Sequence, residues 1–348
     1  MSCRTDSSNL EPGKEKSYCR ILFLDFTKAF DLIDQNILIN KIRQQDVPEI
    51  LVKWISAFLS NRNQRVKVNN VFSSSLTING GVPQGTLLGP ILFTIMINDL
   101  KCSNCPNRKY VDDTTVFEVS KINHPSNLQL STDEIITWTK NNNMKLNAAK
   151  TKTMTINFTK SIPEYQEVVI NDRPIEEVVI FKLLGVQINS QLKWGDHVNY
   201  LVKIASLKLH YLRLLKRAKL STKDLLSVYF STVRSVLEYA APVWGSSLTA
   251  DQSSALEMIQ KRAFRIIFPN TSYEDSLLAN NISSLKDRRY LLSKKFFNSI
   301  TKTENQVSDL LTPNNNRRHR NNLKFQIPKC KTDRFKYSFI PFALTSFQ

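Results

Sequence analysis

Residues 109–119 read KYVDDTTVFEV, in which β-branched and aromatic residues flank a pair of adjacent acids. This composition predicts a strand, a tight turn and a second strand, with Asp112 and Asp113 at the turn. Adjacent like charges raise one another's pKa, so a counter-charge is expected beside them. An Asp-Asp pair seen alone is more often a solvated turn, and the neighbouring segments decide between the two interpretations.

A third acid, Asp25, lies near the end of the apolar run RILFLDF at 20–26, which is typical of a buried strand. A buried carboxylate is unfavourable unless it is paired, hydrogen-bonded or bound to a metal. Magnesium binds a few carboxylates together with substrate phosphates, so two Mg²⁺ ions, or Mn²⁺ in their place, would satisfy Asp25, Asp112 and Asp113. Two ions about 3.5–4 Å apart activate a hydroxyl nucleophile and stabilise a leaving pyrophosphate.

The rest of the chain divides into a mixed part and a helical part. Apolar spacing predicts helices at 28–44, 49–60, 87–100 and 127–141, then at 197–218, 221–237 and 251–268, and it predicts β structure at 64–69, 71–78, 151–158 and 167–184. The segment GGVPQG at 80–85 predicts a loop. The fold class is therefore α+β, with an antiparallel sheet and helices up to about residue 190 and an all-α region beyond it.

The net charge of +18 indicates a polyanionic partner, nucleic acid before membrane. The excess is uneven: residues 1–200 carry 23 Lys and Arg against 20 Asp and Glu, whereas residues 201–348 carry 25 against 10. The helix predicted at 197–218 combines an apolar stripe, Leu201, Ile204, Leu207, Tyr211 and Leu215, with the basic residues Lys203, Lys208, Arg213, Lys216 and Arg217. This pattern predicts a helix along a nucleic-acid backbone, the alternative being a merely solvated basic face.

The sequence also contains information on the cellular compartment of the protein. No apolar run approaches the roughly 20 residues that span a bilayer, and the start, MSCRTDSSNL, has no apolar core of the kind that a secretory signal needs. The five cysteines are scattered and odd in number. We therefore expect an intracellular protein with reduced thiols, in the nucleus, the cytoplasm or both, that is not secreted and has no membrane partner. The oligomeric state stays unknown at this stage.

Seven segments, in this order, resemble successive motifs of reverse transcriptases, and those of the LINE-type (non-LTR) retrotransposon branch most. They are LFLDFTKAFD (22–31), GGVPQGTLLGPILFTIMINDL (80–100), YVDDTTVF (110–117), WTKNNNMKLNAAKTKTM (138–154), FKLLGVQINSQLKW (181–194), LEYAAPVWG (237–245) and LEMIQKRAFRIIF (256–268). A YVDD sequence alone is weak evidence, whereas several motifs in the right order are strong. The resemblance covers roughly residues 20–345.

The resemblance implies a right-hand polymerase, with a palm at 20–192 and a helical thumb at 193–312. A disordered or residual segment at 1–19 would precede the palm, and a basic tail at 313–348 would follow the thumb. The implied activity is that of an RNA-directed DNA polymerase, a nucleotidyltransferase whose partners are an RNA template, a DNA primer and a deoxynucleoside triphosphate (dNTP). The primer 3′-hydroxyl would attack the α-phosphate of the dNTP.

Individual residues also receive roles from the resemblance. Asp25, Asp112 and Asp113 would be catalytic and would bind the metal ions. The nucleotide-binding residues would be Phe26, Phe30, Gln84, Gly85 and Lys150, with Lys152 left as an alternative to Lys150. Phe30 would exclude a ribose 2′-hydroxyl, and the primer would contact Tyr110, Leu184 and Gly185. The five basic residues of the helix at 197–218 would contact the backbone of the nucleic acid.

Only 24 residues precede Asp25, so the resemblance implies that the fingers and the endonuclease of the family are missing from this chain. Two hypotheses therefore stay open: a working polymerase, and a catalytically inactive nucleic-acid-binding remnant of one. A group II intron maturase is a third hypothesis, but the stretch after residue 313 leaves little room for its intron-binding domain.

Overall fold

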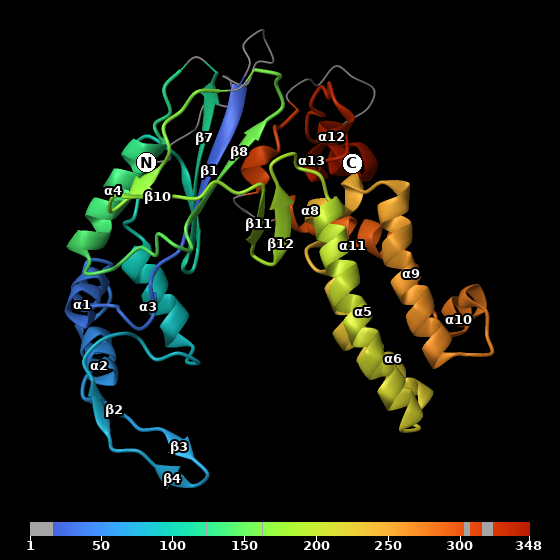
Figure 1. Ribbon diagram of the computed structural model, residues 1–348, viewed down its shortest axis with the longest axis horizontal. Helices are drawn as coiled ribbons and strands as arrows, with labels where there is room; N and C mark the ends of the chain where they lie inside the picture. Colours follow the sequence, from blue (N-terminus) through green and yellow to red (C-terminus); the bar gives the residue numbers. More distant parts are fainter. Residues whose placement is uncertain (1–16, 123, 162, 303–306, 315–322) are drawn as a thin grey trace. The chain divides into compact units, whose positions relative to one another are not determined.

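The computed structural model describes residues 17–122, 124–161, 163–302, 307–314 and 323–348. It divides into two compact units, one up to Leu184 and the other from Gly185 onward, and the chain path of each can be followed in Figure 1. The predicted N-terminal segment lies outside the described residues up to residue 16, as does the part of the predicted basic tail at 315–322.

The first unit is built on a four-stranded sheet in the order β6-β7-β1-β8, with every neighbouring pair antiparallel. Its strands are β1 (Ser17–Leu24), β6 (Asn107–Tyr110), β7 (Asp113–Lys121) and β8 (Lys152–Asn157). The apolar run predicted as a buried strand is the inner strand β1, whose residues Leu22, Phe23 and Leu24 are all buried. The predicted hairpin is the pair β6–β7, so the mixed fold class and its antiparallel sheet are confirmed.

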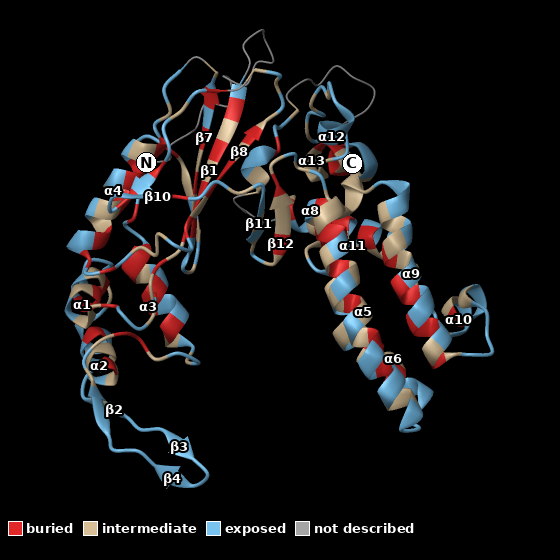
Figure 2. Ribbon diagram, viewed as in Figure 1, coloured by how far each residue is buried: buried red, intermediate tan, exposed pale blue. Residues whose placement is uncertain are grey.

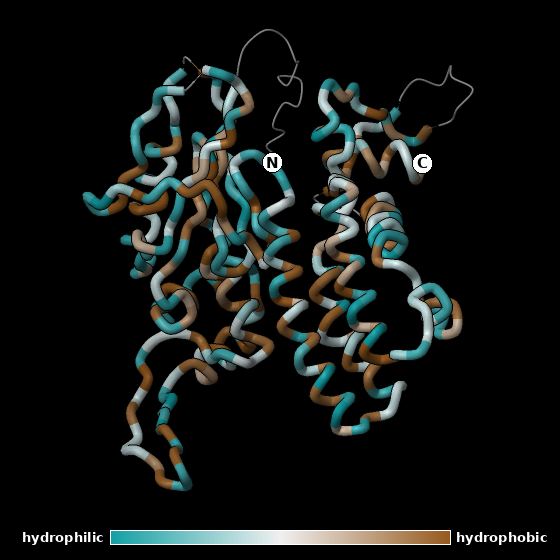
Figure 3. Tube along the Cα trace, turned by 45° about the vertical axis from the view of Figure 1, so that its right-hand side comes forward, coloured by the Kyte–Doolittle hydropathy of each residue, from teal (hydrophilic) through white to brown (hydrophobic). Residues whose placement is uncertain are grey.

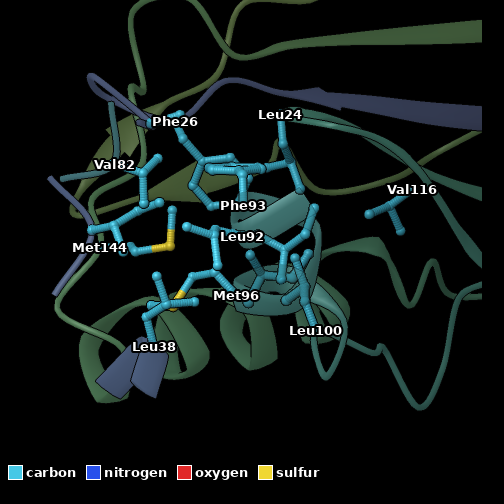
Figure 4. Packing of buried hydrophobic residues seen from close by; sticks show 14 of the residues in the cluster. Leu24, Phe26, Leu38, Val82, Leu92, Phe93, Met96, Leu100, Val116 and Met144 are labelled. Atoms are coloured by element: carbon cyan, nitrogen blue, oxygen red, sulfur yellow. The ribbon is translucent and has the colours of Figure 1, made fainter. Parts of the chain in front are cut away.

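Four helices belong to this unit: α1 (Gln35–Arg43), α2 (Glu49–Leu59), α3 (Leu88–Ile97) and α4 (Leu128–Asn141). Figure 4 shows apolar side chains of α1 and α3 packed with those of the sheet, with Phe93 of α3 beside Leu24 and Phe26. The loop predicted at 80–85 contributes Val82 to the same core. Helix α3 buries Leu92, Phe93, Met96 and Ile97 in this core, while Ile91 on its other side is exposed.

The helix predicted at 28–44 is wrong at its start. Lys28 has a φ of 45°, which ends any helical path there. The helix begins instead at Gln35, because the Asp34 carboxylate accepts hydrogen bonds from the amides of Asn36 and Ile37 and so caps the first turn.

Short strands complete the first unit. They are β2 (Arg62–Gln64), β3 (Lys67–Val68), β4 (Val71–Phe72), β5 (Leu76–Ile78), β9 (Val169–Ile170), β10 (Arg173–Pro174) and β11 (Ile180–Leu183). A turn at Asn69 and Asn70 joins β3 to β4, and both residues have positive φ, as a two-residue hairpin turn requires. Figure 3 shows hydrophobic and hydrophilic residues mixed along this hairpin, where Val68, Val71 and Phe72 are exposed.

The second unit is helical apart from β12 (Val186–Asn189). Its α-helices are α5 (Gly195–Arg217), α6 (Thr222–Val228), α7 (Ser235–Glu238), α8 (Ala241–Trp244), α9 (Ala250–Ile267), α10 (Tyr273–Ala279), α11 (Leu285–Ile300), α12 (Asp333–Lys336) and α13 (Phe339–Phe347), with short turns of other helix types at Gly245–Ser247 and Ser308–Leu310. Buried residues recur along α5 and α9, which pack against one another (Figure 2). The predicted all-α region is confirmed.

Two expectations for this unit need correction. The helix predicted at 221–237 is interrupted, because a π-helical segment, η2 (Tyr229–Arg234), stands between α6 and α7. The apolar stripe predicted on α5 is wrong at two positions, since Leu207 and Tyr211 are each 64% exposed. The helix buries Leu201, Ala205, Leu209 and Leu212 instead.

Candidate active site

The predicted carboxylates come together at one end of the sheet. Tyr110 pairs with Asp113, so Val111 and Asp112 form a two-residue turn between β6 and β7. In the register of β1 with β7, Leu24 lies opposite Thr114. Asp25 is the next residue after β1. If the register continues by one residue, Asp25 lies opposite Asp113, with the two Cα atoms about 4.5–5.5 Å apart as in other antiparallel pairs. Asp25 is half-buried, whereas Asp112 and Asp113 are exposed.

The electrostatics agree with this arrangement. Partial burial of its carboxyl group raises the pKa of Asp113, and the negative charges of Asp112 and then Asp25 raise it further. A cation among the three acids would relieve this repulsion, and carboxylate oxygens are the ligands that magnesium prefers. In the described part of the chain no three His, Cys, Asp or Glu side chains converge on a single metal position. Carboxylate is the donor type that Mg²⁺ prefers, but among the described residues these acids do not form a ready three-ligand metal site.

The turn itself is strained. Val111 has a φ of 55°, a backbone conformation that β-branched residues rarely adopt. A two-residue hairpin needs such a conformation at its first central position, and glycine or asparagine usually supplies it. The side chain of Val111 packs partly against the hydrophobic core of the unit. Strain of this kind is typical of functional sites, where the surrounding structure holds an unfavourable residue in place.

Backbone hydrogen bonds fix Asp25 to a segment far along the chain. Its carbonyl oxygen accepts a bond of 2.8 Å from the amide of Asn147. Its own amide donates to the Thr151 hydroxyl oxygen at 3.3 Å. Thr151 is completely buried, so this hydroxyl has no exchange with water. Both main-chain groups of the first carboxylate residue are therefore held by residues 147–151.

The same segment carries the two lysines between which the sequence left a choice. The Lys152 ammonium donates to the carboxylate of Glu176 at 2.6 Å and to the carbonyl of Ala149 at 2.9 Å. Lys150 is exposed, and its backbone amide bonds to Asn147 while its ammonium makes no ion pair within the described residues. Of the two side chains, that of Lys150 is the one available to an incoming ligand.

Arg62 holds the loop at 80–85 in place. Its guanidinium donates to the carbonyl oxygens of Gly80 at 3.0 Å, Gly81 at 2.8 Å and Leu59 at 3.1 Å. Gly81 has a φ of 70°, and a Cβ atom there would lie 2.8 Å from the carbonyl oxygen of Phe30. Only glycine permits this approach, which lets the amide of Val82 bond to that same carbonyl.

Gln84 lies at the end of this loop, beside a cavity of about 570 Å³ that Asp31, Arg62 and Gln64 also line. Its side-chain amide donates to the Asp31 carboxylate at 2.9 Å. The following residue, Gly85, has a φ of 78° and open space around its Cα. The loop thus presents an exposed face that is anchored at both ends.

The two aromatic residues predicted to bind a nucleotide occupy different environments. Phe30 is half-buried, and its ring stacks on Phe93 with centroids 4.7 Å apart. Phe26 is only 5% exposed and lies in the core, with its ring edge toward Trp138, as Figure 4 shows for its position among the apolar side chains. Phe30 keeps a surface on which a ligand could lie, whereas Phe26 is part of the hydrophobic core and has almost no surface left for the nucleotide contact predicted for it.

The residues predicted to contact the primer are a surface tyrosine and a turn. Tyr110 is 64% exposed beside the acid turn. Leu184 and Gly185 have φ values of 46° and 84°, as expected of the central residues of a tight turn. Their proposed role in holding a primer stays a prediction.

The basic residues of α5 belong to the second unit. Lys203, Arg213 and Arg217 are exposed, and Lys208 is half-buried. Lys216 is different, because its ammonium donates to the carbonyl of Ile267 at 3.1 Å and so caps the C-terminal end of α9. Four of the five predicted contacts thus remain available to phosphate groups.

Two positioning residues were missed by the sequence reasoning. Thr151 lies 126 residues from Asp25, and Arg62 lies 18 residues from Gly80. Neither belongs to a recognisable pattern, and only the folded structure brings them to their partners. The hydrogen bond between Gln84 and Asp31, which are 53 residues apart, could not be predicted from the sequence either.

The first unit thus combines a hairpin that carries two adjacent acids, a strand-end acid in register with it and a glycine-proline loop, in the order that the sequence motifs predict. Residues 2–194 match the family described as reverse transcriptase (RNA-dependent DNA polymerase). The chain therefore belongs to the reverse transcriptase family, and the predicted resemblance is confirmed.

The curated relatives are polymerases of mobile elements. The chain is 29% identical to the RNA-directed DNA polymerase from mobile element jockey of Drosophila melanogaster over 273 residues, which cover 74% of this chain and 29% of that protein. It is 26% identical to a probable RNA-directed DNA polymerase from transposon BS of the same organism, over 74% of this chain and 30% of that protein. These matches support the LINE-type branch. The chain spans about 30% of the length of these relatives.

Among solved structures, the chain is similar to telomerase from Candida tropicalis. The apo form matches with a TM-score of 0.40 and 13% identity, over 78% of this chain and 44% of that one. The complex with a fragment of telomeric RNA matches with a TM-score of 0.39 and 12% identity, over 86% and 49%. In the described residues, no helix is both long and apolar enough to cross a membrane.

Proposed function

We propose that this chain is the palm and thumb of an RNA-directed DNA polymerase from a LINE-type retrotransposon, with the palm at 20–192 and the thumb at 193–312. The observation that carries the proposal is the register of the antiparallel sheet, which brings the strand-end Asp25 opposite Asp113, next to Asp112 in the turn between β6 and β7. Three carboxylates are kept in such proximity where a divalent cation neutralises them. The three acids lie within residues 2–194, the part of the chain that matches the reverse transcriptase family, and this supports the proposal.

Asp25 and Asp112, with Asp113 beside them, would hold two Mg²⁺ ions, or Mn²⁺ in their place. When bound, such ions favour deprotonation of a primer 3′-hydroxyl and neutralise the charge that develops on the transferred phosphate. The residues of the chain would do the positioning. The bonds from Asn147 and Thr151 fix the backbone of Asp25, and catalysis that depends on position and charge is sensitive to small displacements.

The nucleotide would lie between the loop at 80–85 and the segment at 147–151. Gln84 and Gly85 would contact its base or sugar, Phe30 would lie under the ribose, and Lys150 would face the β- and γ-phosphates. The assignment of Lys150 rather than Lys152 rests on the ion pair that already binds Lys152 to Glu176. Tyr110, Leu184 and Gly185 would contact the primer, and the exposed basic residues of α5 would contact the backbone of the RNA–DNA duplex.

The test is primer extension on an RNA template with magnesium, using the chain beside its Asp112→Asn variant. The matched control is Asp46→Asn, which removes the same charge at an exposed turn outside the site. A polymerase extends the primer with the chain and with the control, and loses nearly all extension with Asp112→Asn.

The alternative function is that of a nucleic-acid-binding remnant, which the exposed basic residues of α5 would support without any catalytic role for the acids. Its outcome differs: neither the chain nor any variant extends a primer, while all of them bind the RNA–DNA duplex with the same salt dependence. A chain that neither extends nor binds the duplex contradicts both functions.

A further inference from the structure

The long hairpin at 62–78, in which β2 pairs with β5 and β3 with β4, carries a surface that no role given above explains. Every residue from 63 to 77 is exposed, and Figure 2 shows this along the strands β2, β3 and β4. A two-stranded hairpin that is exposed on both faces is only marginally stable in water. Exposed apolar side chains gathered on such a projection are typical of a binding surface.

The charge of the hairpin indicates the kind of partner. Residues 62–78 include three basic side chains, Arg62, Arg65 and Lys67, and no acidic one. Arg65 and Lys67 are exposed, and neither forms an ion pair with a residue that the structure describes. A surface that is basic throughout attracts a polyanion, and nucleic acid is the polyanion that the net charge of +18 already indicates.

The basic groups gather around one aromatic ring. The guanidinium carbon of Arg65 lies 4.3 Å from the ring centre of Phe72, and the Lys67 ammonium lies 5.3 Å from it. Lys67 is the strand partner of Phe72, so these side chains share one face of the hairpin. The phenylalanine is still 49% exposed. Aromatic rings flanked by cations bind single-stranded nucleic acids, because bases stack on the ring while the cations neutralise phosphates.

The opposite face of the same strands is different. It carries Val68 and Val71, which pair with one another and are 62% and 72% exposed. Successive side chains of a strand alternate between its two faces, so neither valine lies on the face of Phe72. These valines bring no charge to attract phosphates, and they therefore provide a matched comparison within the hairpin.

The base of the hairpin adjoins the candidate active site. Gln64 and Ile78 line the cavity of about 570 Å³ that Gln84 also lines. Arg62, the first residue of β2, donates to backbone carbonyls of the loop at 80–85 and so joins the hairpin to that loop. The basic hairpin is thus continuous with the surface to which the sequence motifs assign the nucleotide.

We propose that the hairpin at 62–78 binds the unpaired part of the template strand, with a base stacked on Phe72 and phosphates bound by Arg65 and Lys67. A single strand suits this surface better than a duplex, because only unstacked bases offer a free face to an aromatic side chain. The name template rests on the function proposed above, whereas the contact itself requires only a single strand of nucleic acid.

The experiment compares two ligands in the absence of divalent metal. One is a blunt RNA–DNA duplex, and the other is the same duplex with an unpaired extension at the 5′ end of the RNA. Fluorescence anisotropy of a dye on the DNA strand measures the affinity of the full chain for each. Phe72→Ala removes the ring, and Val71→Ala is the matched control. Both positions are exposed, so the urea midpoints of the two variants should equal that of the parent chain.

We expect Phe72→Ala to weaken binding of the extended duplex by about tenfold, the loss expected when one base loses its stacking partner. Its affinity for the blunt duplex should stay unchanged, as should both affinities of Val71→Ala. The proposal is overturned if the two variants bind the extended duplex equally, or if Phe72→Ala weakens both ligands to the same extent. A parent chain that gains no affinity from the unpaired extension overturns it as well.

The dependence of affinity on salt tests the role of the cations. Lys67→Gln removes one phosphate contact, so the slope of log affinity against log salt should fall by about 0.7 for the extended duplex. Lys160→Gln, at an exposed position outside the hairpin, should leave that slope unchanged. Identical slopes for the two variants contradict a phosphate contact at Lys67.

These binding measurements are separate from the test of catalysis. Asp112→Asn should bind both ligands as the parent chain does, because its substitution lies outside the hairpin. If no chain extends a primer and Phe72→Ala still loses affinity for the extended duplex, the polymerase function fails and the hairpin contact stands. If the chain extends primers and Phe72→Ala binds normally, the reverse holds.

Discussion

The amide of Asp25 donates a hydrogen bond of 3.3 Å to the hydroxyl oxygen of Thr151, and 126 residues separate the two. The acceptor is completely buried, and it belongs to the segment that also carries Lys150. One side chain thus connects the first carboxylate residue with the lysine proposed to face the phosphates of a nucleotide.

Removing this acceptor should displace Asp25 without emptying the core. In Thr151→Val the shape is kept and the amide of Asp25 loses its partner, so we expect a loss of about 1–2 kcal/mol in the free energy of unfolding. The rate of primer extension should fall while duplex affinity stays unchanged. Thr151→Ser, which keeps the hydroxyl, is the control and should restore both. Equal behaviour of the two variants would contradict the positioning role.

Lys150 and Lys152 should respond differently to truncation. Lys150→Ala should slow extension by about a hundredfold. This is the usual contribution of a side chain that donates a proton to the leaving group, here pyrophosphate, in the transition state. Lys152→Ala breaks a surface ion pair with Glu176 and should change stability by less than about 1 kcal/mol. Single-turnover primer extension measures the loss of rate in Lys150→Ala. If the chain does not extend a primer, the affinity of each variant for magnesium pyrophosphate is measured instead. Equal losses at both lysines would argue against the assignment.

The repulsion at Asp113 predicts a specific dependence of stability on pH. Its pKa in the folded chain is raised above 3.8, so the protonated form stabilises the fold at low pH and this contribution is lost as the pH rises through the raised value. Asp113→Asn should therefore be more stable than the parent chain at neutral pH, and the difference should vanish below pH 3.8. Urea unfolding at several pH values measures this, with Asp46→Asn as the control.

Strain at Val111 predicts a substitution that stabilises the chain. Asparagine tolerates a positive φ better than valine does, so Val111→Asn should raise the free energy of unfolding by about 1 kcal/mol. Val119→Asn, at an exposed position of β7, makes the same chemical change in ordinary strand geometry and should be neutral or destabilising. The midpoints of urea unfolding of the two variants are compared with that of the parent chain. A lower midpoint for Val111→Asn would show that the packing of the valine side chain outweighs the backbone strain.

His197 predicts an acid-sensitive second unit. It is completely buried among Trp194, Tyr200 and Trp244, and burial lowers its pKa from 6.5 to about 4. Between these two values the unfolded chain binds a proton that the folded chain does not, so stability falls by about 3 kcal/mol as the pH drops through this window. His197→Asn should remove this slope, whatever its effect on stability at neutral pH. If the free energy of unfolding of His197→Asn keeps the same dependence on pH, residues other than His197 cause the acid sensitivity.

Much of the architecture could be predicted because it depends on local patterns. The run of apolar residues ending at Asp25 is long enough to indicate an inner strand, and the acid pair flanked by β-branched residues indicates a hairpin. The start of α1 was mispredicted because Lys28 adopts a positive φ that its residue type does not suggest. The apolar face of α5 was misjudged because several apolar residues compete for one buried stripe, and only packing against α9 decides among them.

The residues of the candidate site could also be predicted only where they belong to a local sequence pattern. Its acids and its glycine-rich loop stand in recognisable motifs, so their types and order could be read directly. The partners that hold them could not, because Arg62 and Thr151 act through single hydrogen bonds to distant backbone atoms. The burial of Arg289 is likewise a property of three-dimensional packing, since an arginine in a helical sequence gives no sign that it is buried.

The pairing of β1 with β7 has a further consequence. Side chains alternate between the two faces of a strand, and in β7 this alternation buries Thr114, Val116 and Glu118. A slip of one residue would turn Val116 outward and would also remove Asp113 from its place opposite Asp25. Packing of the hydrophobic core thus fixes which residue lies opposite Asp25, and a chain that has reached its stable fold already has Asp25 and Asp113 at the same end of the sheet.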